Sequence, residues 1–427
     1  MTLAPARRRL LLVAGCMLAS TTAAAAQEAA GATPEVFRRF GAQVVKIEIV
    51  ETGSAAKASL GSGFYVTGRG HIVTNYHVIS QLVHDPDRYR AQLVDAAGAS
   101  KPVRLLAIDV VHDLAVVVAD TTPGQYFQLG APDIAQGDRL YSLGHPHDLG
   151  LSIVEGTYNG LLQHTLYPKI HFTGSLNSGM SGGPAILRDG RVAGINVSTE
   201  GNQVSFLVPV DRARELLQRG TVAGYAPPKS FLLEAGTQIH AYQDRYLDGI
   251  FASPVRTVTL GPYTLPTQPA PFFNCWADAM REKEQPYESI DHQCSTDDYL
   301  FISADQFSGV VSMHHRVLSS DELNRFRFAS LYEQNFAGAD GEDAAEEDVT
   351  RYRCGTRNVR RAEGTLRAAF CLRRYRKFPG LYDVVVRAAA LDGGRQGVVT
   401  TLTLSGVSYE NAERVTRRYL EAITWTK

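Results

Sequence analysis

Hydrophobic and polar positions alternate with a period of two in short runs along the first half of the chain, and glycine-rich turns separate these runs. Apolar side chains at Val45, Ile47 and Ile49, for example, alternate with charged ones, which is the pattern of a strand with one buried face. A short amphipathic helix is predicted after the last run, from Asp211 to Gln218. The predicted strands, in chain order, are 45–49, 61–66, 71–74, 114–119, 139–143, 152–158, 169–173, 185–187, 192–197 and 204–208.

The second half of the chain has a different pattern, and residues 221–230, which hold Gly224 and Pro227, are predicted to form a linker. Prolines then break the chain into short extended pieces before regular patterns return near its end. We therefore predict a mostly β domain over 36–220 and a separate α+β accessory domain over 231–427. The later patterns are strands over 382–390 and 396–404 and a helix over 409–423.

Composition narrows the class of protein. The chain has 427 residues, 44% of them apolar and 20% charged, which excludes a mostly disordered protein and allows two or three domains. The formal net charge of −1 argues against a general binder of nucleic acid or of anionic membranes. Beyond the N-terminal segment, no apolar run approaches the roughly 18 residues that a membrane-spanning helix needs. Nucleic-acid partners and membrane spans are therefore not expected.

The first 26 residues have the three regions of a secretory signal peptide. Arginines at 7–9 precede a short apolar run, and small residues then lead to an Ala-x-Ala site that ends at Ala26. We predict that residues 1–26 are removed and that the mature protein is periplasmic or secreted. An alternative is a bacterial lipobox that ends at Cys16, through which the protein would be anchored by a lipid.

Four further cysteines lie in the second half of the chain, and none lies in 36–220. This usage fits an oxidising compartment. Four cysteines allow three pairings, and the sequential one is favoured only because it closes short loops. No Cys-x-x-Cys pair is present, so disulfides are favoured over a metal site. The disulfide candidates are Cys275, Cys294, Cys354 and Cys371.

Three local motifs follow one another in the order His, Asp, Ser. The first is Thr-Asn-Tyr-His at 74–77, at the end of a predicted strand, and the second is His-Asp-Leu-Ala-Val at 112–116, where an acid precedes a buried strand. The third is Asn-Ser-Gly-Met-Ser-Gly-Gly at 177–183. A serine hydroxyl is a weak nucleophile unless a base takes its proton, and backbone N–H groups have to stabilise the oxyanion that forms.

The roles in a catalytic triad follow from this chemistry. Ser181 is the predicted nucleophile, and His77 is the base that takes its proton and later protonates the leaving amine. Asp113 is expected to accept the other ring N–H of His77 and to stabilise the imidazolium. The backbone N–H groups of Gly179 and Ser181 are the predicted oxyanion hole, because glycine is free to adopt the conformation that points its N–H into the hole.

With these motifs, residues 36–217 resemble the trypsin-like serine proteases, and most closely their bacterial HtrA/Deg branch. The resemblance implies two six-stranded antiparallel β-barrels with the triad in the cleft between them. It also implies endopeptidase action on protein or peptide substrates, without a metal or a cofactor. Further motifs that carry the resemblance are Gly-Ser-Gly-Phe at 61–64, Leu-Gly-His-Pro at 143–146 and Gly-Ile-Asn at 194–196.

Three features depart from the pattern of that branch. Met180 stands where Asn or Asp is usual, and Tyr76 precedes the candidate base where a small or amide residue is common. Residues 225–427 contain no convincing carboxylate-binding loop of a PDZ domain. The chaperone function and caged assembly of the branch are therefore not expected for this chain, and its oligomeric state is not predicted.

By position in the family, Leu176, Val197 and Ser205 line the pocket for the residue before the scissile bond. None of them is acidic, so we predict that small or medium aliphatic residues fit there. The whole sequence predicts an exported serine endopeptidase, with envelope protein quality control as one role. Two alternatives stay open: a weakly active or inactive homologue that binds peptides, because of Met180 or Tyr76, and an envelope adaptor whose C-terminal domain is the working part.

Overall fold

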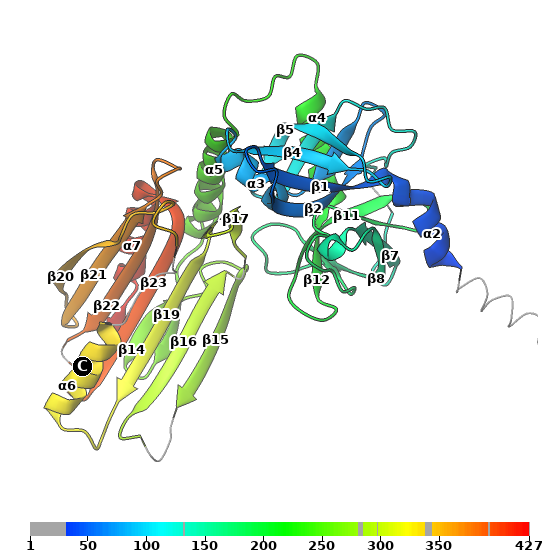
Figure 1. The fold of residues 1–427 in the computed structure, drawn as a ribbon. Helices are drawn as coiled ribbons and strands as arrows, with labels where there is room; N and C mark the ends of the chain where they lie inside the picture. The colour runs from blue at the N-terminus through cyan, green and yellow to red at the C-terminus, as the bar shows by residue number, and fades with distance from the viewer. Residues whose placement is uncertain are drawn as a thin grey trace, which may run out of the picture.

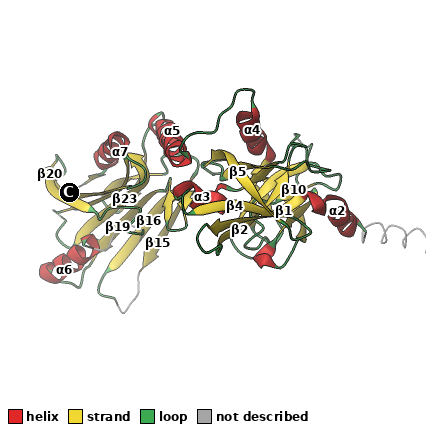
Figure 2. Cartoon of the chain, turned by 45° about the horizontal axis from the view of Figure 1, so that its top comes forward, coloured by secondary structure: helices red, strands yellow, loops and turns green. Residues whose placement is uncertain are grey.

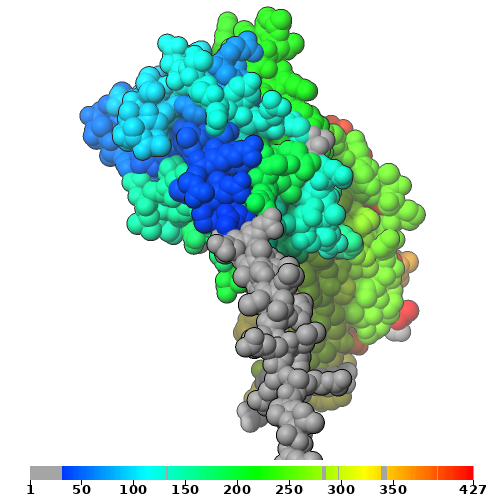
Figure 3. Space-filling model, turned by 90° about the vertical axis from the view of Figure 1, so that its right-hand side faces the viewer, coloured from blue at the N-terminus to red at the C-terminus, as the bar shows by residue number. Residues whose placement is uncertain are grey.

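The computed structural model describes residues 31–130, 133–280, 285–296, 298–337, 344–391 and 393–426. The predicted signal peptide, with Cys16, lies outside these residues. The described chain has two parts, a pair of β-barrels and a broad sheet, with helix α5 (Phe231–Phe251) beside both of them (Figure 1). Seen from the side of the barrels, the second part lies behind the first (Figure 3). None of the helices in the described ranges is long and apolar enough to span a bilayer.

The first barrel closes in the strand order β1-β2-β3-β6-β5-β4, and its neighbouring strands are antiparallel. Val45, Ile47 and Ile49 of β1 are buried, as the alternation predicts. Helix α3 follows β3 directly and carries the second half of the first motif. The bounds are β1 (Val44–Glu51), β2 (Lys57–Tyr65), β3 (His71–Thr74), α3 (Tyr76–His84), β4 (Tyr89–Val94), β5 (Ser100–Asp109) and β6 (Leu114–Ala119).

The second barrel closes in the order β10-β11-β12-β9-β8-β7 and is antiparallel as well. Together the two barrels confirm the mostly β fold that the resemblance implies. Helix α4 returns from β12 to pack on β5 and β6 of the first barrel, and it lies on the outer side of the barrels (Figure 2). The bounds are α2 (Ala32–Phe40), β7 (Arg139–Gly144), β8 (Ser152–Leu161), β9 (Ile170–Phe172), β10 (Pro184–Ile186), β11 (Val192–Thr199), β12 (Ser205–Pro209) and α4 (Val210–Thr221).

The second part is an α+β unit around an antiparallel sheet of seven strands in the order β15-β16-β19-β23-β22-β21-β20. Helices α5 and α7 pack on this sheet with the buried rings of Tyr242, Tyr246 and Tyr419. A small hairpin, β17–β18, leaves the sheet and lies beside α3 of the first barrel. The bounds are β13 (Arg256–Leu260), β14 (Tyr263–Thr267), β15 (Phe273–Met280), β16 (Glu288–Thr296), β17 (Leu300–Ser303), β18 (Gln306–Ser308), β19 (Val311–Ser319), α6 (Arg325–Phe336), β20 (Arg353–Arg360), β21 (Thr365–Arg374), β22 (Leu381–Ala390), β23 (Gln396–Ser408), α7 (Tyr409–Glu421) and β24 (Thr424–Trp425).

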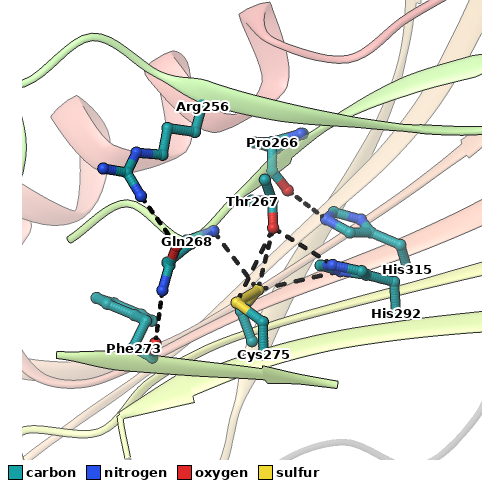
Figure 4. Close-up of a disulfide and its surroundings, with 9 residues drawn as sticks. Arg256, Pro266, Thr267, Gln268, Phe273, Cys275, His292 and His315 are labelled. Carbon is teal, nitrogen blue, oxygen red and sulfur yellow. Dashed lines mark hydrogen bonds between the residues drawn. A yellow bond between two sulfur atoms is a disulfide. The ribbon is translucent and has the colours of Figure 1, made fainter. Parts of the chain in front are cut away.

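Two disulfides join the edge strands of the seven-stranded sheet to their neighbours. Cys275 of β15 bonds Cys294 of β16, and Cys354 of β20 bonds Cys371 of β21, which is the sequential pairing. Each pair lies directly opposite across its hairpin. Around the first disulfide, Thr267 Oγ1 lies 3.3 Å from Cys294 Sγ (Figure 4). Because an edge strand has no partner on its outer side, these bonds hold the two elements of the sheet that can fray most easily.

The second disulfide should matter for stability more than for chemistry. Every residue of β20 is exposed, so few apolar contacts hold that strand. We expect the paired change Cys354→Ser and Cys371→Ser to lower the free energy of unfolding by about 3 kcal/mol, from the loss of a short closed loop. Urea unfolding measures this change, and amide exchange should become faster in β20 before other strands. An unchanged unfolding midpoint would show that the sheet holds β20 without the bond.

The two parts share an apolar cluster and are not joined by the chain alone. Ala235 and Ile239 of α5 and Ile302 of β17 are packed in one cluster with the core of the first barrel. Later in α5, Leu247 and Ile250 belong to the core of the seven-stranded sheet instead. Helix α5 therefore buries different faces in two cores. Its apolar residues do not form the single stripe by which an amphipathic helix is predicted from sequence.

Candidate active site

His77 and Asp113 lie on neighbouring connections of the first barrel. β3 ends at Thr74, Asn75 precedes α3 with extended backbone angles, and His77 therefore lies in the first turn of the helix. Asp113 lies in the turn between β5 and β6 with a φ of 53°, in the left-handed region that Asp tolerates better than most residues. These two connections place the candidate base and the candidate acid side by side.

The carboxylate of Asp113 holds His77 with both oxygens. The backbone N–H of His77 donates to Oδ1 at 2.8 Å, and the ring Nδ1 lies 2.5 Å from Oδ2. The backbone carbonyl of Asp113 also accepts hydrogen bonds, from the side chain of Asn75 at 2.7 Å and from the backbone N–H of Tyr76 at 3.2 Å. Four bonds thus fix residues 75–77 to the β5–β6 turn, and one of them holds the imidazole with Nδ1 facing the acid and Nε2 left for other chemistry.

This contact sets the charge preference of the imidazole. Burial lowers the pKa of His77, but the charge of Asp113 and its hydrogen bond raise that pKa by more, so that it lies above its ordinary value. The side chain of His77 keeps 25% of its surface exposed. The ring is therefore prepared to accept a proton and is still reachable from solvent.

The turn that carries Ser181 lies against the segment that carries His77. A Cβ atom at Gly182 would lie 2.2 Å from the carbonyl oxygen of Ser62, 2.5 Å from Thr74 Oγ1 and 3.0 Å from the backbone nitrogen of Asn75. Only glycine, with its φ of +83°, allows this close approach. The third motif is therefore brought next to the first, although more than 100 residues separate them in the sequence.

The hydroxyl of Ser181 makes its hydrogen bond with the carbonyl oxygen of Val197, at 3.4 Å. Within the described ranges, no hydrogen bond joins this hydroxyl to His77. Bonds between a nucleophile and its base are often long or poorly aligned in a site without substrate. The pair of His77 and Asp113 is thus formed, and the hydroxyl would have to turn from Val197 to complete a triad.

Two backbone N–H groups near Ser181 are free to stabilise an anion. In the part of the chain that the structure describes, those of Gly179 and Ser181 donate to no protein acceptor, whereas the neighbouring Met180 and Gly182 donate to carbonyl oxygens. Gly179 has a φ of +95°, and a Cβ atom there would lie 2.4 Å from the carbonyl oxygen of His145. Two unpartnered donors on either side of one residue are the arrangement of an oxyanion hole.

Ser62 fixes this loop, a role that the Gly-Ser-Gly-Phe motif at 61–64 did not predict. It is fully buried in β2, and its hydroxyl donates to the carbonyl oxygen of Gly179 at 2.7 Å and accepts the N–H of His145 at 2.8 Å. Its own backbone N–H donates to the carbonyl oxygen of Ser181 at 2.8 Å. One residue of the first barrel thereby connects the two predicted oxyanion donors of the second.

Replacing Ser62 should therefore loosen the oxyanion loop. We expect Ser62→Ala to lower the free energy of unfolding by about 1–3 kcal/mol, because a buried N–H and a buried carbonyl lose their partner. Peptidase activity, measured as kcat/KM, should fall by about 10- to 100-fold, less than for complete loss of a donor. Ser289→Ala in β16, an equally buried serine of the broad sheet, is the control and should leave kcat/KM unchanged. Equal effects of both changes on activity would contradict this role of Ser62.

The side chains of the two residues that depart from the family pattern are both buried. The side chain of Met180 is fully buried in the core of the second barrel, and its carbonyl accepts the side-chain amide of Asn196 at 3.1 Å. Tyr76 is fully buried as well, and its hydroxyl donates to the carbonyl oxygen of Ile302 at 3.3 Å. Neither side chain displaces a candidate catalytic group.

Of the three predicted pocket residues, Val197 contacts Ser181, and Leu176 and Ser205 contact each other. Val197 offers the carbonyl that accepts the hydroxyl of Ser181. The backbone N–H of Leu176 donates to Ser205 Oγ at 3.3 Å, so these two are neighbours. Ser205 is fully buried, and its hydroxyl donates to the carbonyl oxygen of Gly174 at 2.6 Å. The hydroxyl of Ser205 is therefore already used within the second barrel.

Three features together indicate the class of protein. They are the closed six-stranded barrels, the His–Asp pair and the serine turn with two free N–H groups. Residues 61–195 match the family described as "Trypsin-like peptidase domain". Within that class, the chain is similar to the HtrA/Deg proteases. It is 32% identical over 200 residues to "Serine protease HTRA2, mitochondrial" of Bos taurus, covering 44% of this chain and 42% of the relative. Residues 61–195 are thus similar to trypsin-like peptidase domains, and the relatives that match are HtrA/Deg proteases.

Two further comparisons cover a similar share of this chain. "Probable periplasmic serine endoprotease DegP-like" of Halomonas elongata is 32% identical over 198 residues, which are 43% of this chain and 40% of the relative. The solved structure "Crystal structure of Deg5" is 29% identical, covers 47% of this chain and 98% of that chain, and has a TM-score of 0.41. The match spans about two fifths of the length of the two curated relatives.

Proposed function

We propose that this protein is an exported serine endopeptidase that cleaves protein or peptide substrates through an acyl-enzyme, with His77, Asp113 and Ser181 as its triad. The proposal rests on the contacts that both carboxylate oxygens of Asp113 make with His77, beside the serine turn. The free N–H groups of Gly179 and Ser181 support it, since acyl transfer needs both a base and an oxyanion hole.

The reaction would start when the hydroxyl of Ser181 turns from Val197 toward His77 Nε2. His77 takes the proton while Ser181 Oγ bonds to the substrate carbonyl carbon, and the carbonyl oxygen becomes an oxyanion. The N–H groups of Gly179 and Ser181 stabilise this oxyanion, and Asp113 stabilises the imidazolium. His77 then gives the proton to the leaving amine, and a water molecule that His77 activates hydrolyses the acyl-enzyme.

The proposal is tested by labelling the purified protein with a fluorophosphonate, which reacts only with an activated serine. Mass spectrometry should locate the label on Ser181, and Ser181→Ala should abolish it together with the cleavage of unfolded protein substrates. Ser289→Ala, a buried serine of β16 in the broad sheet, is the control and should take the label as the wild-type protein does. A correctly folded protein that takes no label and cleaves nothing would overturn the proposal.

An inactive homologue that binds peptides is the alternative that this experiment separates. The hydrogen bond of Ser181 to Val197 favours it, because the hydroxyl is engaged elsewhere than at the base. The positions of Met180 and Tyr76 weigh against it, because both side chains are packed away from the candidate site. An inactive homologue would bind peptides without taking the label.

Export of the protein and its division into domains are part of the proposal. The two disulfides fit an oxidising compartment, and the Halomonas relative is named as periplasmic. We place the protease domain at 36–220 and the accessory domain at 231–427, with 221–230 as the linker. N-terminal sequencing of the exported protein should begin after Ala26, whereas a lipid on Cys16 would favour the anchored form.

A further inference from the structure

The β17–β18 hairpin of the accessory domain reaches the candidate base. The ring of Phe301 in β17 lies edge-on to the imidazole of His77, with 5.7 Å between ring centroids, and edge-on to the ring of Tyr76 at 6.5 Å. The carbonyl oxygen of Ile302 accepts the hydroxyl of Tyr76. The hairpin lies between the broad sheet and the first barrel (Figure 1). A residue outside the protease domain thus covers one side of the imidazole.

The segment just before this hairpin is fixed to the second barrel as well. Asp298 accepts the backbone N–H of Leu166 at 2.8 Å and pairs with Lys169 at 2.5 Å, and both charged side chains are largely buried. The hydroxyl of Tyr167 donates to the carbonyl oxygen of Tyr299 at 3.2 Å. Residues 298–302 are therefore tied to both barrels, which gives Phe301 a fixed place beside the candidate site.

Phe301 belongs to a cluster of three aromatic rings that we call the aromatic wall: Tyr299, Phe301 and Phe307. The ring of Phe307 lies 4.7 Å from that of Tyr299 and 5.8 Å from that of Phe301. Tyr299 is 49% exposed and Phe307 is 36% exposed, so the wall presents apolar surface to solvent. That surface continues to His77, whose side chain is itself partly exposed.

Negative charges lie near the Tyr299 end of the wall. Burial and the nearby negative charges of Asp113, Glu200 and Asp298 raise the pKa of the Tyr299 hydroxyl. Asp113 belongs to the candidate triad, and Glu200 lies between β11 and β12 of the second barrel. An acidic side chain placed on the wall would meet these charges, whereas an apolar one would bury surface against the rings.

We propose that the aromatic wall is a subsite of the substrate cleft that takes a large apolar side chain flanking the scissile bond of an extended polypeptide. The inference rests on the proposed function. A chain that presents its carbonyl to Ser181 passes the exposed face of His77, where Phe301 and its neighbours stand. The accessory domain thereby contributes to specificity directly, and substrates with Leu or Phe at this position are preferred over those with Ala or Glu.

The test is mass-spectrometric mapping of cleavage in peptide mixtures. The peptides vary at the residue before the scissile bond and at the residue after it. The wild-type protein should prefer Leu or Phe over Ala by about 10-fold at one flanking position, and Glu should be disfavoured further. Phe301→Ala should reduce the preference for Leu over Ala to less than threefold. Phe326→Ala on α6, which removes a ring that is 89% exposed and distant from the barrels, should retain the full preference (Figure 1).

Other outcomes would overturn the inference. If Phe301→Ala lowered the cleavage rate equally for all peptides, Phe301 would only support His77. If it raised the cleavage rate equally for all peptides, the hairpin would merely cover the site. Because Phe301→Ala removes packed surface, Phe301→Leu and Tyr299→Ala are tested beside it, with melting temperatures to show that each variant folds. Both should weaken the preference without a uniform loss of rate.

A separate measurement distinguishes failure of the wall from failure of the proposed function. Fluorescence anisotropy gives the Kd of labelled Leu and Ala peptides for the Ser181→Ala protein, in which no cleavage occurs. The Leu peptide should bind about 10-fold more tightly, and the added change Phe301→Ala should abolish that difference. Equal Kd values for the Leu and Ala peptides would overturn the proposed role of the aromatic wall, even if Ser181 takes the fluorophosphonate label. A difference between the two Kd values would support that role, even if Ser181 takes no label.

Discussion

Asp113→Asn is expected to lower kcat by about 10⁴-fold while the protein stays folded. The amide oxygen can still accept the backbone N–H of His77, as Oδ1 does now at 2.8 Å. The amide nitrogen then faces the ring Nδ1, where Oδ2 lies at 2.5 Å. A donor at that place favours the tautomer with its proton on Nε2, so the imidazole can no longer take the proton of Ser181.

The pH profile gives this prediction a second readout. Catalysis needs neutral His77, so activity is lost as the pH falls through its pKa, which Asp113 raises. Without the charge of Asp113, only the opposing effect of burial remains, and the acidic limb of kcat/KM should move to lower pH. A profile of kcat/KM between about pH 4 and 9 measures the shift.

The chain supplies a matched control for this change. Asp109 holds His112 in the same way, since the backbone N–H of His112 donates to Oδ1 at 3.1 Å and the ring Nδ1 lies 2.9 Å from Oδ2. This pair lies next to the candidate triad, but among the described residues no hydrogen bond joins it to the serine turn. Asp109→Asn should cost stability without a fall in kcat beyond about 10-fold. Equal losses of activity in Asp113→Asn and Asp109→Asn would show that both changes act through folding.

The sequence predicted much of the protease domain because its information is local. Alternation along a strand, glycine-rich turns and the three motifs are each read within a few residues, and the structure has those strands in place. Strands β4 and β5 and helices α2, α3 and α5 were not predicted. In β5, Lys101, Pro102 and Arg104 obscure the alternation, and α5 turns one face to each of two cores.

The supporting contacts of the site could not be predicted for a different reason. The hydroxyl of Ser62 joins a carbonyl 117 positions later and an N–H 83 positions later. Phe301 reaches His77 from the other half of the chain. Such contacts depend on how two barrels and an accessory sheet meet, and no spacing within one segment encodes that. The motifs therefore predict which groups would carry the chemistry, but they did not predict which groups hold those groups in place.

Gly179→Ala is the second change with a large expected effect, a fall in kcat of about 10²- to 10³-fold. Alanine is strained at a φ of +95°, and its Cβ atom would lie 2.4 Å from the carbonyl oxygen of His145. The peptide would have to turn, and its N–H would then leave the oxyanion hole. Single-turnover acylation of Ser181 measures the loss at the step where the oxyanion forms.

Gly137→Ala separates the backbone strain from the loss of the oxyanion donor. Gly137 has a similar φ of +102°, but a Cβ atom there meets no other atom within 4 Å. It precedes the start of β7, whereas Gly144 at the end of that strand packs against Met180 beside the oxyanion loop. Gly137→Ala should therefore lower the melting temperature, because of the backbone strain, and should keep full acylation of Ser181. If Gly179→Ala also kept full acylation, the oxyanion would be stabilised elsewhere, and the loop between Asn177 and Ser181 would have no catalytic role.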